Sequence, residues 1–232
     1  MTSSASFTAT IIAGRDALDD AALARARAIL PAPAAPFWLN PGRAADIPFN
    51  AAVGADQRAL AESLRAALPG ADVVVQPTAG RRKKLFLADM DSTMIGQECI
   101  DELADYAGLK AHVAAITERA MRGEIAFEPA LRERVALLEG LKVSVIDEVL
   151  RDRIKLTPGA QALVRTMRTH GAHTALVSGG FTLFTDRVAA MIGFNENRAN
   201  SLTVIDGHKL AGTVAEPIFG RDAKRAALIE LR

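Results

Sequence analysis

The chain has 232 residues, half of them hydrophobic and 24% charged, which is the composition of an ordinary globular protein with a substantial core. Its formal net charge of +1 gives no electrostatic indication of a nucleic-acid or anionic-membrane partner. The single cysteine, Cys99, excludes an intrachain disulfide, and neither a membrane span nor a signal peptide is recognisable, so we expect a cytoplasmic protein.

Residues 1–80 predict a small α/β domain, which a basic linker at about 78–84 joins to the rest of the chain. The implied order of elements, close to β-α-β-β-α-β, resembles a degenerate ferredoxin-like fold of the ACT type. The elements are a strand at Phe7–Ile12, a helix at Asp19–Leu30, a proline-rich loop or edge segment at 31–41, a helix at 55–68, and a strand at Val73–Val75.

Residues 84–232 predict a Rossmann-like parallel sheet with an inserted helical cap at about 95–155. Two apolar runs, Leu85–Ala88 and His173–Val177, are typical of buried parallel strands. A helical bundle inserted after the first of them would cover the carboxyl end of that strand. The other elements are helices at Glu98–Tyr106, Ala111–Met121, Phe127–Leu138 and Val145–Ile154 (capped by Ser144), a helix opened by Thr157-Pro158, a hairpin of Leu202–Ile205 with Lys209–Val214, and a helix at Asp222–Arg232.

Asp89 and Asp91, in the run Asp-Met-Asp-Ser-Thr, follow the first apolar strand directly. Open α/β sheets place their ligands at this end of a strand, although two solvated loop aspartates would produce the same pattern. One carboxylate could attack phosphorus, and the other could act in turn as general acid and general base. The repulsion between two anions calls for a cation, and Mg²⁺ suits one or two carboxylates together with phosphate and water.

Two further features are compatible with a bound phosphate. Ser178-Gly179-Gly180 follows the second apolar strand, where a hydroxyl and backbone N–H groups at a helix start can hold an anion. A plain strand-to-helix turn is the alternative. Lys224 lies near the start of the last helix, and by itself would be taken for a solvated surface residue.

In this order, Asp-Met-Asp-Ser-Thr, Ser-Gly-Gly-Phe and Ala-Lys resemble the first three motifs of the haloacid dehalogenase phosphatases. The segments 98–104, 121–123 and 127–135 resemble the phosphoserine phosphatases among them. The resemblance covers about residues 84–232 and implies Mg²⁺-dependent hydrolysis of O-phospho-L-serine, a step of serine synthesis. It implies that Asp89 becomes phosphorylated, that Asp91 is the acid and base, and that both hold Mg²⁺.

The resemblance also implies the residues that hold the substrate. Phosphate would be held by Ser178, Gly179 and Lys224. Glu98 and Arg134 would bind the amino and carboxylate groups of serine, in keeping with the bidentate grip of arginine on carboxylates. The apolar neighbours implied are Met121 and Phe127. Pairing of Arg134 with Glu133 or Glu139 on a helix surface remains an alternative, and Met121 and Phe127 could simply build core.

The fourth motif of the family, Gly-Asp-Gly-x-Asn-Asp after a third strand, is absent from the sequence. In the family this motif contributes a side-chain ligand of Mg²⁺. Either the chain is a fragment of a longer enzyme, which the uncapped last helix favours, or it is a truncated product with weak turnover. We therefore expect impaired Mg²⁺ binding and low activity.

Other functions stay open at this point. A related phosphatase or phosphotransferase would act on another small ester, such as phosphohomoserine or phosphothreonine. An amino-acid-binding regulatory module, with the ACT-like domain as ligand site, is the alternative from another class. The sequence contains no dinucleotide or Walker-type glycine motif, and its histidines lack zinc spacing. The oligomeric state is open, with a homodimer as one option.

Overall fold

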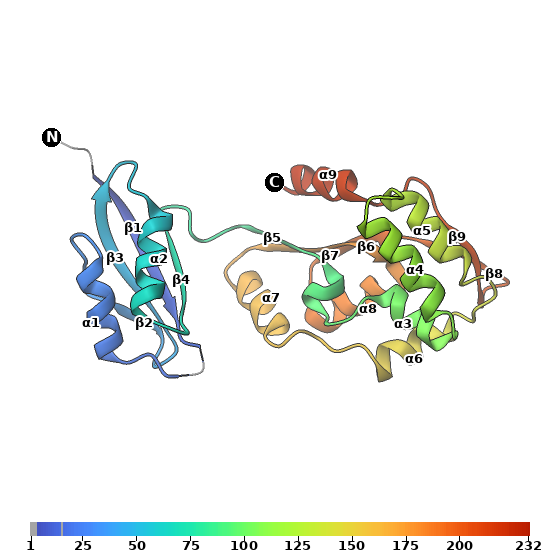
Figure 1. Ribbon diagram of the computed structural model, residues 1–232, viewed down its shortest axis with the longest axis horizontal. Coiled ribbons are helices and arrows are strands. Elements are labelled where there is room, and N and C mark those ends of the chain that lie inside the picture. The colour runs from blue at the N-terminus through green and yellow to red at the C-terminus, as the bar shows by residue number, and fades with distance from the viewer. Residues whose placement is uncertain (1–3, 15) are drawn as a thin grey trace. The chain divides into compact units, whose positions relative to one another are not determined.

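The computed structural model describes residues 4–14 and 16–232, apart from the side chains of Ser4 and Met121. The chain divides into two compact units, Met1–Lys83 and Lys84–Arg232 (Figure 1). Among the described residues, no helix combines the length and the apolar character needed to cross a membrane.

The N-terminal unit is an antiparallel sheet in the strand order β2-β3-β1-β4 with two helices. Its elements are β1 (Ser4–Ile12), α1 (Asp20–Ile29), β2 (Phe37–Asn40), β3 (Ala44–Ala52), α2 (Gln57–Ala67) and β4 (Asp72–Pro77). This order of elements is the expected one. The proline-rich segment contains the edge strand β2, whereas β3 had not been located from the sequence.

Local sequence explains the start of both helices in this unit. The Asp19 carboxylate accepts a hydrogen bond from the Ala22 N–H (2.7 Å), and the Asp56 carboxylate accepts two at the start of α2. Alternate residues of β1, including Phe7 and Ile11, are buried in the core of the unit, as the period of a half-buried strand requires.

The C-terminal unit contains a parallel sheet in the order β5-β6-β7, as the apolar runs predicted for its first two strands. Its elements are β5 (Leu85–Ala88), the irregular turn η1 (Met90–Met94), α3 (Cys99–Tyr106), α4 (Lys110–Met121), α5 (Phe127–Ala136), α6 (Ser144–Asp152), α7 (Ala160–Thr169), β6 (His173–Phe181), α8 (Thr182–Ile192), β7 (Glu196–Asn200), β8 (Leu202–Ile205), β9 (Lys209–Val214) and α9 (Arg221–Leu231).

Helices α3–α6 form a block at the carboxyl end of β5 and β6 (Figure 1). The antiparallel hairpin β8–β9 joins this block, since the Gly140 N–H donates to the Leu210 carbonyl (2.9 Å) beside α5. The core of the unit runs from the sheet into the block without interruption.

Three details differ from the sequence-based expectations. Strand β6 continues to Phe181, so that the serine and glycine motif lies within the end of the strand, where its register with β7 shifts. Ser144 is the first residue of α6 and makes no cap hydrogen bond. Thr157 does not cap α7; its hydroxyl donates to the Thr93 carbonyl (2.7 Å), and α7 starts after the left-handed Gly159.

Candidate active site

Asp89 stands where β5 ends and the chain turns sharply. One carboxylate oxygen accepts the N–H of Met90 (2.8 Å), and the Ile95 N–H donates to the Met90 carbonyl (3.1 Å) to close a wide turn. Within this turn Ser92 has φ +50°, a left-handed conformation that few residues with a side chain adopt. Such backbone outliers cluster at functional sites. The turn directs Asp89 and Asp91 to the same pocket.

The environment of Asp91 suits it to exchange a proton near neutral pH. Burial raises its pKa to about 6, against the lowering effect of hydrogen bonding with Cys99, and the charges of Glu98 and Asp89 raise it further. The Cys99 N–H donates to Asp91 Oδ1 (3.2 Å). Efficient acid–base groups have a pKa near the working pH. Cys99 itself is fully buried, and burial raises the pKa of its thiol, so the side chain is a packing residue of the core.

The end of β6 places Ser178 and two glycines against the aspartates. The Ser178 hydroxyl is buried and accepts the Gly180 N–H (2.9 Å). A Cβ on Gly180 would lie 2.9 Å from Asp91 Oδ2 and 3.1 Å from Ser178 Oγ, so only glycine fits there without displacing one of them. The Ser178–Gly180 segment is thus in contact with Asp91, the candidate for the acid and base.

Lys224 reaches Asp89 from the first turn of α9. Its Nζ lies 2.5 Å from Asp89 Oδ2, and its side chain is 29% exposed. The interpretation of Lys224 as a solvated surface residue is therefore wrong. A cation in this position can hold a phosphate oxygen beside the carboxylate that would attack phosphorus.

Glu98 and Arg134 line the same pocket from the helical block. The Ser92 hydroxyl donates to Glu98 Oε1 (2.6 Å), which holds the carboxylate just before α3. Arg134 Nε donates to the Ala130 carbonyl (3.1 Å) of its own helix. Burial lowers the pKa of Arg134, while Asp101 and Glu98 act in the opposite direction.

Arg134 does not form the surface pairs considered as an alternative. Glu133 pairs with Arg119 (3.1 Å) instead. Among the described side chains, no carboxylate oxygen lies within 4.0 Å of a nitrogen of Arg134. A partly buried guanidinium without an anionic partner suits an anionic ligand.

Phe127, the first residue of α5, contacts the end of the sheet. A Cβ on Gly179 would lie 3.2 Å from its ring, and one on Gly220 would lie 3.4 Å from it. Phe127 is 44% exposed, so it borders the pocket and is not a core residue. The side chain of Met121 lies outside the described part of the structure, and its predicted role stays a prediction.

The pocket has a volume of about 220 Å³, which is large enough to hold a small metabolite. It brings together eight of the residues predicted from the sequence: Asp89, Asp91, Glu98, Phe127, Arg134, Ser178, Gly179 and Lys224. Carboxylates and cations lie side by side in it, an arrangement that can bind a zwitterion carrying a phosphate.

The donor atoms of this pocket fit Mg²⁺ and fit zinc poorly. Asp89 and Asp91 supply oxygen atoms only, and Mg²⁺ binds to one or two carboxylates when phosphate and water complete its shell. Among the residues that the structure describes, no group of three or more His, Cys, Asp or Glu side chains could hold a metal ion.

Sequence reasoning did not find Asn200, which is 2% exposed at the end of β7. Its side chain is hydrogen bonded to Gly179 and to Phe219, near the start of α9. The run Glu-Asn-Arg-Ala-Asn has no apolar pattern, so neither the strand nor its buried asparagine was recognisable.

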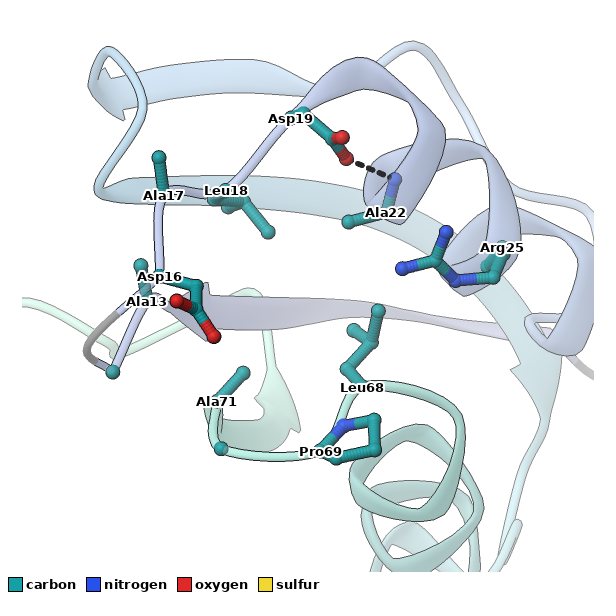
Figure 2. A pocket seen from close by; sticks show the side chains of 12 residues that line it. Ala13, Asp16, Ala17, Leu18, Asp19, Ala22, Arg25, Leu68, Pro69 and Ala71 are labelled. Atoms are coloured by element: carbon teal, nitrogen blue, oxygen red, sulfur yellow. Dashed lines mark hydrogen bonds between the residues drawn. The ribbon is translucent and has the colours of Figure 1, made fainter.

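A second and larger hollow, of about 630 Å³, lies in the N-terminal unit between the loop after β1 and the loop after α2. Figure 2 shows the Asp16 carboxylate and the Arg25 guanidinium on opposite sides of it, with Leu68 and Pro69 below. The carboxylates of Asp16 and Asp19 line this hollow together with the guanidinium of Arg25, and the described residues that line it include neither serine nor lysine.

Residues 86–231 match the family of haloacid dehalogenase-like hydrolases. A phosphoserine phosphatase of Polaromonas sp. (strain JS666) is 50% identical over 151 residues, which are 63% of this chain and 64% of that protein.

Two solved structures are also similar. A phospho-aspartyl intermediate analogue of phosphoserine phosphatase is 37% identical with a TM-score of 0.56, and the match covers 64% of this chain and 72% of that one. A probable phosphoserine phosphatase from Vibrio cholerae, unliganded, is 26% identical with a TM-score of 0.72, and that match covers 98% of this chain and 68% of the other.

Proposed function

Because the chain belongs to the haloacid dehalogenase-like hydrolase family, we propose that it hydrolyses O-phospho-L-serine to L-serine and phosphate through a phosphorylated Asp89. The observation that carries this proposal is the contact of Lys224 with Asp89 in a pocket that Glu98 and Arg134 also line. The first pair suits phosphoryl transfer, and the second suits an amino acid. The 50% identity to a protein named phosphoserine phosphatase supports the same substrate.

The proposed reaction has two steps. A carboxylate oxygen of Asp89 attacks phosphorus, the bond from phosphorus to the serine oxygen breaks, and Asp91 donates a proton to that oxygen. Water then attacks the phosphorus of the acyl phosphate, Asp91 takes a proton from the water, and phosphate leaves Asp89 as a free carboxylate. A pKa of about 6 allows Asp91 to serve in both protonation states.

Charge on the phosphate is held by groups of the chain. Lys224 binds a phosphate oxygen, while the Ser178 hydroxyl and the neighbouring backbone N–H groups bind the others. Asp89 and the backbone carbonyl of Asp91 would hold Mg²⁺, which reduces the repulsion between carboxylate and phosphate when bound.

The substrate is chosen by the two charged residues of the helical block. Arg134 receives the carboxylate of serine, and Glu98 receives its ammonium group, with the Phe127 ring along the apolar side. An ester that lacks either group leaves a charged residue unpaired, which weakens its binding. In this proposal residues 84–232 are the catalytic domain, with its cap at about 95–155.

The direct test traps the intermediate. The full chain is incubated with O-phospho-L-serine and Mg²⁺, quenched in acid, reduced with borohydride, digested and examined by mass spectrometry; the reduction expels phosphate from an aspartyl phosphate and leaves homoserine at that position as the label. We expect labelling at Asp89 and phosphate release, both abolished in Asp89→Asn. Asp147→Asn, an exposed aspartate of the helical block paired with Arg187, is the control and keeps both. Phosphate release by Asp89→Asn at the wild-type rate would contradict the mechanism.

A second function is proposed for the N-terminal unit, as an ACT-like domain that binds a small zwitterion. The opposed Asp16 and Arg25 beside the hollow of about 630 Å³ favour it (Figure 2). Calorimetry with L-serine checks it: we expect binding that Arg25→Ala weakens and that Asp89→Asn and Arg134→Ala leave unchanged. Loss of the signal in Arg134→Ala, which removes the proposed ligand of the serine carboxylate, would assign the binding to the first pocket.

A further inference from the structure

Asn200 joins two chain segments that meet at the candidate active site. It is the last residue of β7, opposite Phe181 of β6, and its side chain is 2% exposed. Nδ2 donates to the carbonyl of Gly179 (2.8 Å) and to the carbonyl of Phe219 (3.2 Å). Oδ1 accepts the N–H of Phe219 (2.6 Å). Both donor hydrogens and one acceptor site of the amide are therefore used.

Each of the two segments carries one side of the phosphate site. Gly179 lies between Ser178 and Gly180 at the end of β6. Phe219 precedes Gly220, the residue before α9, whose carbonyl accepts the Lys224 N–H (3.0 Å). Asn200 does not line the pocket itself, so any effect on phosphate must pass through these neighbours.

Helix α9 has few other means of holding its position. Within Arg221–Leu231, Ala227 is the only buried residue. The ion pair of Arg198 with Glu230 (2.7 Å) attaches the far end of the helix to β7, but Glu230 is largely exposed, and exposed pairs contribute little. The buried hydrogen bonds of Asn200 therefore position the end of α9 from which Lys224 projects.

We propose that Asn200 is a positioning residue that fixes the distance between the Ser178–Gly180 segment and Lys224, and so sets the width of the phosphate site. The inference rests on the proposed function, because it takes those groups as the phosphate ligands. An amide is required, since only a side chain that donates twice and accepts once can bridge two carbonyls and one N–H.

The test compares two variants of Asn200 with a matched asparagine of the same strand. Asn200→Ala removes the bridge. Asn200→Asp keeps the shape and the bond from Phe219 N–H but cannot donate to the two carbonyls. Asn197→Ala is the control, because Asn197 bridges β7 to Thr185 (2.6 Å) and Asp186 (3.0 Å) of α8, away from the pocket.

Each full-chain protein is assayed for kcat and KM with O-phospho-L-serine, for affinity toward inorganic phosphate with Mg²⁺ by calorimetry, and for stability by urea unfolding. We expect both Asn200 variants to lose affinity for phosphate and to lose kcat/KM by roughly 10²-fold, as displacement of a binding group by about 1 Å does. Asn197→Ala should keep the wild-type kcat/KM and the wild-type affinity for phosphate, although its loss of stability is comparable. Equal phosphate affinity in wild type and the Asn200 variants, or equal losses in Asn197→Ala, would overturn the proposal.

The phosphate measurement separates this inference from the proposed function. A wild type that binds phosphate but does not hydrolyse phosphoserine refutes the function and leaves the effect of Asn200 on binding measurable. If neither Asn200 variant folds, native-state hydrogen exchange of the wild type decides. The amides of Gly180 and Phe219 should then open with the same free energy, as members of one cooperative unit, and unequal values would contradict the coupling.

Discussion

Replacement of Asp91 by asparagine should abolish catalysis and at the same time stabilise the folded C-terminal unit at neutral pH. Asparagine has the same shape and can still accept the N–H of Cys99 through its oxygen. Asparagine cannot ionise, however. The wild type buries a charged carboxylate beside Glu98 and Asp89, and the variant does not.

The magnitude follows from the pKa of Asp91, which rises from 3.8, its ordinary value, to about 6 in the folded chain. Since one pKa unit corresponds to about 1.4 kcal/mol, ionised Asp91 costs the folded state at most about 3 kcal/mol. The folded state binds the proton more tightly than the unfolded state does, so this part of the stability is fully present below pH 3.8 and is lost as the pH rises through 6. The stabilisation by Asp91→Asn should thus appear between these values and level off above them.

Urea unfolding without Mg²⁺, at a series of pH values from 4 to 8, measures the effect. Circular dichroism follows the helical C-terminal unit, while the fluorescence of Trp38, the one tryptophan of the chain, follows the N-terminal unit and serves as an internal control. A stability difference between wild type and Asp91→Asn that does not change with pH would refute the reasoning, because burial would then not be what raises this pKa.

Three other substitutions follow from the contacts. Gly180→Ala places a methyl group 2.9 Å from a carboxylate oxygen of the acid–base aspartate, so we expect kcat to fall by roughly 10²-fold in steady-state assays, and a wild-type kcat would contradict the contact. Arg134→Ala should lower kcat/KM for phosphoserine by at least roughly 10²-fold more than for 4-nitrophenyl phosphate, which has no amino-acid group; equal losses would reassign the residue. Arg81→Ala leaves the buried Asp46 without its ionic partner (2.7 Å) and should destabilise the N-terminal unit by about 3 kcal/mol, as read by tryptophan fluorescence. The exposed Arg82→Ala is its control, and an equal effect of both would show that charge alone is responsible.

Short apolar runs and turn signals were enough to locate most of the C-terminal unit. Strand β5 begins and ends where its run of apolar residues does, and the hairpin β8–β9 has the predicted bounds. Strand β7 was missed because Glu-Asn-Arg-Ala-Asn is polar and only partly buried before its last residue. The end of β6 was misplaced because its two glycines, which make close approach to Asp91 possible, look like a turn in the sequence.

Some features of the candidate site could likewise be predicted from the sequence, whereas others depend on the tertiary structure. The sequence by itself determined which residue types could carry phosphoryl transfer and in which order they occur, namely Asp89, Ser178 and Lys224. The approach of Lys224 to Asp89 across 135 positions was decided only by the tertiary structure, which places the start of α9 beside the end of β6. So was the raised pKa of Asp91, because burial depends on segments that are distant in the chain. Asn200 belongs wholly to this second group: its neighbours in sequence reveal nothing, and its hydrogen bonds exist only once β6, β7 and the start of α9 have come together.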